Sequence, residues 1–501
     1  MKILTAEEIK KTEQLSFEKY FTEAELMNKA GYECFKKIVR YYGDNIVGNT
    51  VLVVCGNGKN AGDGFVIAKL LCEFGADAKI VLADKMPVID EPLTYFNEAK
   101  NSGVEVLDFD DTDFNCTLIV DCIFGIGFHG EPKEPFNNVF DTINCSNAIV
   151  VSVDTPSGTD AANGSVSNAV KADLTIAIST LKYCHVLPPS NEYCGKVVTV
   201  DIGIPEDCYT KKYAETITKN AVKSCFSKRS VNSHKGDFGH QLNICGSYKM
   251  CGASVISAKS ALKTGVGLLK CVFPKSIYPV MTSHLTQPLF SPMSENEEKT
   301  LSMGSLTHIL KELSWADSIL LGCGIGNNDD TQVLTNQIIR ECNVPIVLDA
   351  DGINCILPNI DILREAHGDV VITPHPAEMA RLISESINYV QQNRIAVAKA
   401  FANEYGAIVV LKGANTVVTN GEDVFVNTTG NAGMAMGGTG DMLAGIIGSF
   451  IAQGIDAFSS AKCAVYIHGL CGDITAKELS QRGMTVDDML ELLPALLSEF
   501  E

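Results

Sequence analysis

Short apolar runs recur along the first half of the chain, and stretches with helical spacing separate most of them. The runs occupy residues 51–54, 78–82, 104–107, 117–120, 148–153 and 196–200. Brief runs rich in β-branched residues predict buried parallel strands. Their alternation with helices predicts a doubly wound α/β sheet, in which ligands bind beyond the carboxyl ends of the strands.

The same pattern begins again in the second half. Further strands are predicted at residues 241–245, 268–273, 318–321, 345–348, 370–372 and 407–411. Between the two halves, the strand pattern disappears over a polar, lysine-rich stretch. We therefore predict one α/β domain at residues 1–215, a linker at 216–228 and a second α/β domain at 229–501.

The composition and net charge limit the classes of molecule that the protein is expected to bind. The chain has 501 residues, 46% of them hydrophobic, and a formal net charge of −20, which argues against nucleic acid as a partner. We expect no membrane span and no signal peptide, because the apolar runs are too short and the N-terminus is polar. The 18 cysteines are scattered, which favours reduced thiols in a cytoplasmic protein. We expect small-molecule substrates and a homo-oligomer.

Polar residues gather at the predicted strand ends of the first half. A glycine-rich loop at 56–64 joins a strand to a helix, and Asp121 and Asp154 each end a strand. A single aspartate of this kind commonly caps a loop, but several at one sheet edge favour a site. Oxygen atoms of Asn60, Asp121 and Ser157 suit a hard cation, and a single carboxylate among them favours potassium.

The second half contains the run Gly-Gly-Thr-Gly-Asp at 437–441, followed by apolar residues at helical spacing. A glycine loop that opens a helix presents unpaired backbone N–H groups and favours an anion. Asp441 then suits the role of a base in phosphoryl transfer. The alternative is that Asp441 is an ordinary residue of the first helical turn.

Other predicted strand ends of the second half also have candidate residues. Lys412 supplies a positive charge for phosphates, and Asp349 and Asp351 suit magnesium or a tight turn. His375 follows a proline at a strand end, where we favour a ligand contact over a structural role. His468, within a helical pattern, is predicted to belong to the core.

The first half resembles the NAD(P)H-hydrate epimerase domain. The resemblance rests on the glycine loop, the Asp121 motif, Asp-Thr-Pro-Ser-Gly at 154–158 and Asp-Ile-Gly-Ile-Pro at 201–205. It implies a Rossmann-like three-layer αβα fold, potassium at Asn60, Asp121 and Ser157, and Asp154 as the acid/base group. The substrate contacts that it implies are Lys59, Asn60, Ala61, Gly62, Asp63, Gly125, Ile126, Gly127, Phe128, His129, Gly130, Glu131 and Asp154.

The second half resembles ribokinase-like ADP/ATP-dependent NAD(P)H-hydrate dehydratases. The resemblance rests on Lys-Gly-Ala-Asn-Thr at 412–416, the 437–441 run and Thr-Pro-His-Pro-Ala-Glu at 373–378. It implies ADP or ATP with magnesium, and Asp441 as the catalytic base. The implied substrate contacts are Ala253, Gly324, Gly326, His375 and Asp441, and the implied nucleotide contacts are Lys412, Gly413, Ala414, Asn415, Thr416 and Gly440.

Together the two resemblances predict a bifunctional repair enzyme. One half interconverts the R and S forms of hydrated NADH and NADPH, and the other dehydrates the S form at the expense of ADP or ATP. The alternative is a ribokinase-like kinase for a vitamin precursor, with a non-catalytic nucleotide-binding module in front of it.

Overall fold

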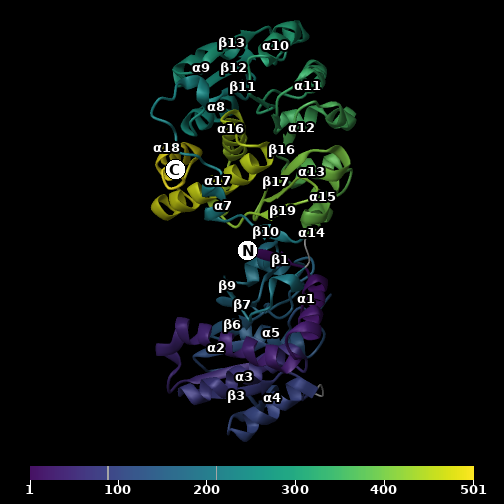
Figure 1. Ribbon diagram of the computed structural model, residues 1–501, viewed down its shortest axis with the longest axis vertical. Helices are drawn as coiled ribbons and strands as arrows, with labels where there is room; N and C mark the ends of the chain where they lie inside the picture. Colours follow the sequence, from purple (N-terminus) through teal and green to yellow (C-terminus); the bar gives the residue numbers. More distant parts are fainter. Residues whose placement is uncertain (87–89, 210–211) are drawn as a thin grey trace. The chain divides into compact units, whose positions relative to one another are not determined.

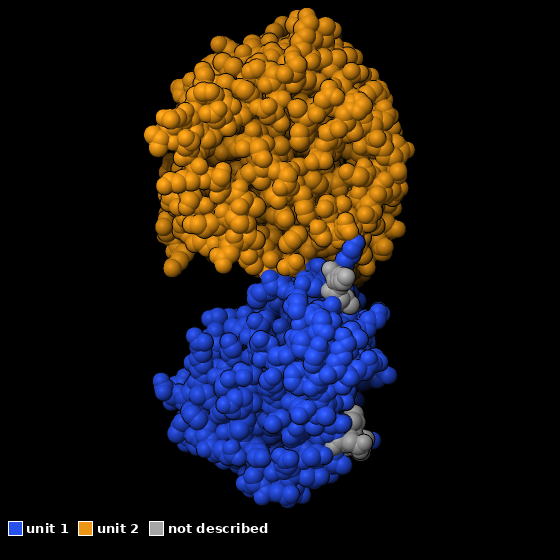
Figure 2. Space-filling model, viewed as in Figure 1, with its two compact units in different colours: residues 1–214 blue, residues 215–501 orange. Residues whose placement is uncertain are grey.

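The computed structural model describes residues 1–86, 90–209 and 212–501, and they form two compact units. Unit 1 comprises residues 1–214 and unit 2 comprises residues 215–501 (Figure 2). Figure 1 labels their helices and strands. Over the described ranges, no helix is both long and apolar enough to cross a membrane.

Unit 1 is built on a sheet of seven strands, all of them parallel to their neighbours. Their order is β4 (Glu105–Asp108), β3 (Asp77–Leu82), β2 (Thr50–Cys55), β5 (Leu118–Cys122), β6 (Ile149–Val153), β7 (Leu174–Ile178) and β9 (Lys196–Val200). The chain runs outward from β2 in one direction and then returns to β5 on its other side. The strand order therefore reverses between β2 and β5, where a doubly wound sheet opens a crevice.

The sheet of unit 1 is buried on both faces. In β2, Val51 and Val53 pack into one apolar cluster, and Leu52 and Val54 pack into another. Helices α2 (Glu23–Ile46), α3 (Lys59–Phe74) and α4 (Asp90–Asn101) contribute to the first cluster, and α5 (Phe136–Cys145) contributes to the second. The alternation of one strand between two helical layers produces the predicted three-layer, Rossmann-like arrangement.

The N-terminal segment of unit 1 adds elements outside this sheet. Strand β1 (Lys2–Leu4) pairs with β8 (Leu181–Lys182), and helix α1 (Ala6–Lys19) follows β1. A capping box between Thr5 and Glu8 fixes the start of α1. The short helix α6 (Tyr183–Val186) directly follows β8.

Unit 2 is built on a larger sheet. Its strands are β13 (Leu289–Met293), β12 (Leu268–Pro274), β11 (His240–Ile244), β14 (Ser318–Leu321), β15 (Ile346–Leu348), β16 (Val370–Ile372), β17 (Ile408–Leu411), β18 (Val417–Thr419), β19 (Val424–Val426) and β10 (Ala214–Thr216), in that order. Pairing is parallel from β13 to β17 and antiparallel from β17 to β19. The strand order reverses between β11 and β14, which places a second crevice there.

Helix α16 (Thr439–Ala452) is the buried centre of unit 2. Helices α8 (Cys251–Lys263) and α17 (Ala457–Leu479) pack against it (Figure 1). A Cβ on Gly445 of α16 would lie 2.1 Å from Ser260 Oγ of α8, so glycine permits this close approach. The apolar spacing that followed Asp441 in the sequence therefore corresponds to a core helix.

The other helices of unit 2 complete its layers. They are α7 (Lys219–Lys223), α9 (Tyr278–His284), α10 (Leu306–Leu313), α11 (Asp329–Glu341), α12 (Asp351–Cys355), α13 (Pro376–Leu382), α14 (Ile387–Gln392), α15 (Arg394–Tyr405) and α18 (Val486–Leu497). Helix α7 falls in the stretch predicted as a linker, and its Val222 is buried in the core of unit 2. This stretch is packed against unit 2 because an apolar side chain anchors it.

Candidate active sites

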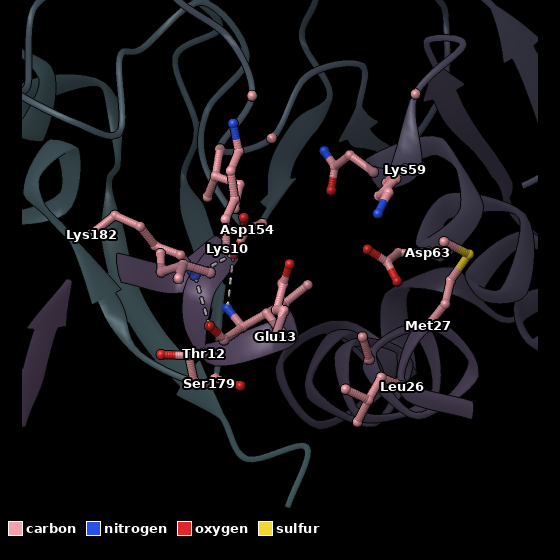
Figure 3. Close-up of a pocket in the computed structure, with 18 of the residues that line it drawn as sticks. Lys10, Thr12, Glu13, Leu26, Met27, Lys59, Asp63, Asp154, Ser179 and Lys182 are labelled. Atoms are coloured by element: carbon pink, nitrogen blue, oxygen red, sulfur yellow. Dashed lines mark hydrogen bonds and ion pairs between the residues drawn. The ribbon is translucent and has the colours of Figure 1, made fainter. Parts of the chain in front are cut away.

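Unit 1 contains a cavity of about 660 Å³ (Figure 3). It lies at the switch between β2 and β5, and α1 and α2 also contribute to its wall. Of the predicted substrate contacts, the structure places these in the wall: Lys59, Asn60, Asp63, Gly125, Ile126, Gly127, Phe128, His129 and Asp154. Ala61, Gly62, Gly130 and Glu131 are not among the residues that line it.

The predicted potassium ligands come together beneath this cavity. Asp121 is fully buried and accepts hydrogen bonds from Ser152 Oγ (2.8 Å), Ser157 N (2.9 Å) and Ser157 Oγ (2.5 Å). The amide of Asn60 donates to the carbonyl oxygen of Phe124 over 2.9 Å, and Phe124 N donates to Ser157 Oγ over 2.8 Å. Side chains from the first turn of α3, from β5 and from the segment after β6 are therefore joined in one hydrogen-bond network through Phe124.

The charge balance of this cluster favours a cation. Burial raises the pKa of Asp121, although the hydrogen bonds from Ser157 and Ser152 oppose the shift. A buried carboxylate with neutral donors alone is costly, and a bound monovalent cation would offset that cost. Carboxylate, hydroxyl, amide and carbonyl oxygens are ligands that hard cations prefer.

Asp154 has an unusual backbone conformation and a fixed orientation. Its φ is 67°, in the left-handed region that non-glycine residues seldom adopt. Ile178 N donates to its Oδ1 over 3.2 Å, and the buried Lys182 ammonium forms an ion pair with the same oxygen. The other oxygen, Oδ2, lies toward Gly125, 3.6 Å from an ideal Cβ at that glycine. One oxygen of Asp154 is thus held by the protein while the other is directed toward the cavity wall.

His185 holds the backbone of Asp154. Lys182 N donates to His185 Nδ1 over 3.0 Å, and His185 Nε2 lies 2.8 Å from Asp154 O. Because Nδ1 accepts, Nε2 carries the proton and donates to that carbonyl. Burial lowers the pKa of His185 to about 3, so the ring is neutral at physiological pH and this bond persists.

The contribution of α1 to the cavity wall was not predicted from the sequence. Glu13 lines the cavity, and burial followed by the Asp154 charge raises its pKa to about 7. Burial also raises the pKa of Asp63 well above its usual value. The available signal was a carboxylate at position 13 beside the buried helix positions Ile9, Thr12 and Ser16.

Lys59 and Ala61 of the glycine-rich segment at 56–64 lie in the first turn of α3. Lys59 is 59% exposed and pairs with Glu23 over 2.5 Å. Ala61 lies fully buried in the first turn of α3 and does not have a positive φ. A Cβ therefore costs no backbone strain at position 61.

In unit 2, the glycine loop opens α16 as predicted. Gly438 is the N-cap residue, with a φ of 97°, and a Cβ on it would lie 2.7 Å from Ile256 Cδ1. Asp441 lies in the first turn of α16, where burial and then the Asp349 charge raise its pKa to about 6. At neutral pH this carboxyl is mostly ionised, as a base must be.

Lys412 and Asp349 form a second buried pair beside Asp441. Lys412 Nζ donates to Asp349 Oδ1 over 2.7 Å, and Thr373 Oγ1 donates to the same oxygen over 2.6 Å. Burial alone would raise the pKa of Asp349, but Lys412 and Thr373 hold it below its usual value. An ideal Cβ on Gly440 would lie 3.3 Å from Lys412 Nζ, so the ammonium also faces the α16 N-terminus.

A cluster of three possible metal ligands, Cys323, Asp349 and Asp441, suits magnesium poorly. Ligand atoms of Cys323, Asp349 and Asp441 lie within 4.8 Å of one another. A hydrogen bond with Cys245 and burial raise the pKa of Cys323 well above its usual value, so its thiol stays protonated. Magnesium prefers oxygen ligands, and Asp349 is already paired with Lys412. Asp351, the other predicted ligand, instead accepts from Gly326 N over 2.9 Å.

Two of the predicted substrate contacts of unit 2, Ala253 of α8 and Gly324 after β14, lie next to each other. An ideal Cβ on Gly324 would lie 3.0 Å from Ala253 Cβ, and Gly324 has a φ of 67°. His375 is the N-cap of α13 and its Nδ1 accepts from Ala377 N over 3.1 Å, which leaves Nε2 as the donor. Its side chain is 47% exposed. The ring therefore caps a helix, and its Nε2 lies 3.4 Å from Glu378 Oε1.

Two residues that anchor loops of unit 2 were not predicted. Arg394 is 1% exposed and donates to Leu411 O (2.9 Å) and Lys412 O (3.1 Å). Asp473 of α17 accepts from Gly430 N (2.9 Å) and Asn431 Nδ2 (3.0 Å). Both lie outside the sequence motifs whose loops they hold, so the spacing of those motifs could not predict them.

His468 is buried, which confirms its predicted place in the core.

The chain resembles solved structures of the ribokinase-like class over unit 2. A ribokinase-like protein from Enterococcus faecalis is 25% identical with a TM-score of 0.51, covering 57% of this chain and 96% of that chain. The ADP/ATP-dependent NAD(P)H-hydrate dehydratase from Bacillus subtilis, crystallised with ATP and magnesium, is 25% identical with a TM-score of 0.50, covering 57% and 99%. These likenesses assign unit 2 to the ribokinase-like class.

Family models and full-length relatives cover both units. The NAD(P)H-hydrate dehydratase model matches residues 242–495, and the YjeF-related protein N-terminus model matches residues 23–184. The bifunctional NAD(P)H-hydrate repair enzymes Nnr from Moorella thermoacetica and Escherichia coli are 31% and 32% identical, over 100% and 95% of this chain and 97% and 89% of theirs. The chain belongs to the family of bifunctional NAD(P)H-hydrate repair enzymes, with epimerase and nucleotide-dependent dehydratase activities.

Proposed function

We propose that unit 1 inverts the configuration at C6 of hydrated NADH and NADPH, and that unit 2 dehydrates the S epimer with ADP or ATP. On this division, residues 1–215 are the epimerase domain, 229–501 the dehydratase domain, and 216–228 connects them. The observation that carries the proposal for unit 2 is the ionised Asp441 at the glycine-rich N-terminus of α16, beside the Asp349–Lys412 pair.

The dehydration step follows from the position of Asp441. The Asp441 carboxylate takes the proton of the 6-hydroxyl, and the oxygen attacks the terminal phosphorus of the nucleotide. Backbone N–H groups of Gly438 to Gly440 and the α16 dipole stabilise the charge on the transferring group. As the new phosphorus–oxygen bond forms, the bond from that phosphorus to the rest of the nucleotide breaks, so that ADP leaves as AMP or ATP leaves as ADP. The C6–O bond of the 6-phosphate then breaks with its electron pair and releases inorganic phosphate. C5 loses a proton to solvent, and the C5–H electron pair forms the C5=C6 double bond of the dihydronicotinamide ring. The loop 412–416 and Gly440 hold the nucleotide, and Ala253, Gly324, Gly326 and His375 hold the hydrated cofactor.

For unit 1, we assign Asp154 as an acid/base group and Asn60, Asp121 and Ser157 as the holders of potassium. The oxygen donors and the costly buried Asp121 carboxylate support this ion. When bound, potassium supplies positive charge that neutralises Asp121 and attracts an electron-rich ligand group. For unit 2, we assign magnesium to the phosphates of the bound nucleotide, since the Cys323–Asp349–Asp441 group suits it poorly.

The proposal for unit 2 is tested with the purified S epimer of hydrated NADH. We expect one NADH and one inorganic phosphate to form for each nucleotide consumed, with ADP and ATP compared side by side. Omitting the nucleotide should stop NADH formation. Transfer of phosphate to a vitamin precursor in place of hydrated NADH would contradict the proposal.

The potassium assignment has its own test. Protein dialysed into lithium salts should lose thermal stability and epimerase rate together, and potassium should restore both. Asp121→Asn should abolish the response to potassium, because it removes the only carboxylate among the assigned ligands. A response that survives in Asp121→Asn would place the ion elsewhere.

A further inference from the structure

Glu13 is an acidic residue in the unit 1 cavity to which the family resemblance gives no role. It comes from α1, whereas Asp154 follows β6 and Asp63 comes from α3. Figure 3 shows its carboxyl directed into the cavity, with Asp154 and Lys182 on one side and Asp63 and Lys59 on the other. Three carboxyl groups from three separate segments therefore line the cavity.

The fold does not use the Glu13 carboxyl. Within the part of the chain that the structure describes, it has no hydrogen-bond partner and no ion pair at contact distance. The other acids in the first turns of α1 are committed, since Glu8 accepts from Thr5 N over 2.8 Å and Glu7 pairs with Lys11 over 2.7 Å. An uncommitted, half-buried carboxyl in a cavity is a candidate for proton transfer.

The groups that face Glu13 keep its proton exchangeable near neutrality. Burial and the charges of Asp154 and Glu23 raise its pKa, while Lys182 and Lys59 lower it, for a net value of about 7. The neighbouring Asp63 couples to it as well. Asp154, by contrast, is ion-paired with Lys182. Glu13 therefore has an exchangeable proton near neutral pH, and the second carboxyl, Asp154, is held in place by an ion pair.

We propose that Glu13 is the second proton-transfer residue of the epimerase site, acting with Asp154 on the two faces of C6; this rests on the function proposed for unit 1. Glu13 donates its proton to the 6-hydroxyl, the C6–O bond breaks with its electron pair, and water leaves. The lone pair of ring N1 forms a C6=N1 bond. A second water adds to the opposite face of C6 and gives a proton to Asp154, and the C6=N1 pair returns to N1.

This sequence balances without an oxidant or a reductant. One water leaves and one enters, one proton comes from Glu13 and one goes to Asp154, and exchange with solvent resets the pair. The reverse inversion uses the same groups in the opposite order. An inversion with a donor on one face and an acceptor on the other requires two such groups, and one residue on one side of the ring cannot serve both faces.

The test measures epimerisation alone, with no nucleotide present, by following the purified R epimer of hydrated NADH as it converts to S on a chiral separation. Glu13→Gln should lower the rate roughly a hundredfold or more, and Glu13→Asp should recover part of it. Glu18→Gln, an exposed change on the same helix, is the matched control and should keep the full rate. In water enriched in ¹⁸O, each inversion should introduce one labelled oxygen at C6.

The pH profile separates a catalytic role from a structural one. The wild-type rate from R to S should fall as pH rises through about 7, and Glu13→Gln should lose this limb while its melting temperature stays unchanged. A Glu13→Gln rate within twofold of wild type, or inversion with the original oxygen retained, would overturn the inference. If the wild-type chain does not epimerise at all, the proposed function of unit 1 fails instead.

Discussion

The two units place the same kind of charge arrangement in two different surroundings. In unit 1, a strand-end carboxylate, Asp154, is paired with the buried Lys182, and Glu13 titrates nearby. In unit 2, Asp349 is paired with Lys412, and Asp441 titrates nearby. Each unit therefore combines an Asp–Lys ion pair with a nearby carboxyl that can exchange a proton.

The difference lies in what surrounds the exchangeable carboxyl. Asp441 stands at the N-terminus of a long buried helix behind three glycines, where backbone N–H groups favour a phosphoryl group. Glu13 lies in the interior of α1 and not at a helix N-terminus, in a cavity that also has apolar walls. The backbone around the carboxyl, more than the carboxyl itself, separates phosphoryl transfer from water exchange.

The largest expected effect is a loss of dehydration activity in unit 2 alone. Asp441→Asn should lower dehydration of the S epimer roughly a thousandfold, because the 6-hydroxyl loses its base while the glycine loop stays intact. Nucleotide binding, measured by calorimetry, should change little, and epimerisation should be unaffected. A dehydration rate close to that of wild type would remove Asp441 from the proposed chemistry.

The next largest effect follows from removal of the Asp154–Lys182 ion pair of unit 1. Lys182→Met leaves the Asp154 carboxylate buried without its partner, which should lower the free energy of unfolding by about 3 kcal/mol. Epimerisation should fall with it, since Asp154 loses its fixed orientation. Urea unfolding and the epimer assay measure the two effects.

The matched change in unit 2 sharpens this prediction. Lys412 is 19% exposed and Lys182 is 1% exposed, so Lys412→Met should cost less stability than Lys182→Met. It should still impair dehydration, because Lys412 faces both Asp349 and the α16 N-terminus. An equal or larger loss of stability for Lys412→Met would contradict the burial argument.

The pH dependence of the two activities should run in opposite directions. Dehydration needs ionised Asp441, so its rate should rise about tenfold per pH unit below about 6 and level off above that value. Epimerisation from R to S needs protonated Glu13 and should decline above about 7. Separate initial-rate profiles for the two steps test this, and parallel profiles would refute it.

The smallest effect concerns the rim of the unit 1 cavity. Lys59 is mostly exposed and its pair with Glu23 is solvated, so Lys59→Asn should change the free energy of unfolding by less than about 1 kcal/mol. We expect an unchanged epimerase kcat and a KM within a few-fold of wild type. A large fall in kcat would show that Lys59 takes part in the reaction.

The sequence alone predicts what depends on local pattern. The buried parallel strands, the glycine loop before Asp441 and the core helix after it all follow from spacing and residue type. Strand β13 was not predicted because it contains Pro292 and has exposed positions. Strands β18 and β19, which pair antiparallel with each other, were not predicted either. Such strands are defined by their neighbours, not by their own apolar runs.

The residues that complete the sites arrive by tertiary packing. Glu13, Arg394 and Asp473 reach their sites from helices far from the motifs that they serve. Lys182 is brought to Asp154 because β7, which ends four residues before Lys182, pairs with β6, which ends directly before Asp154. No spacing rule links such residues to a motif. In the sequence, these residues are recognisable only as polar side chains on otherwise apolar helix faces. Such residues also occur where they have no functional role.

The most direct measurement uses the whole chain on a mixture of R and S hydrated NADH with excess nucleotide, following NADH by absorbance. The wild-type chain should convert both epimers to NADH, whereas Asp154→Asn should show a fast phase equal to the S fraction and then the slow rate of spontaneous epimerisation. Complete and equally fast conversion of both epimers by Asp154→Asn would contradict the assignment of unit 1 as an epimerase that works through this residue.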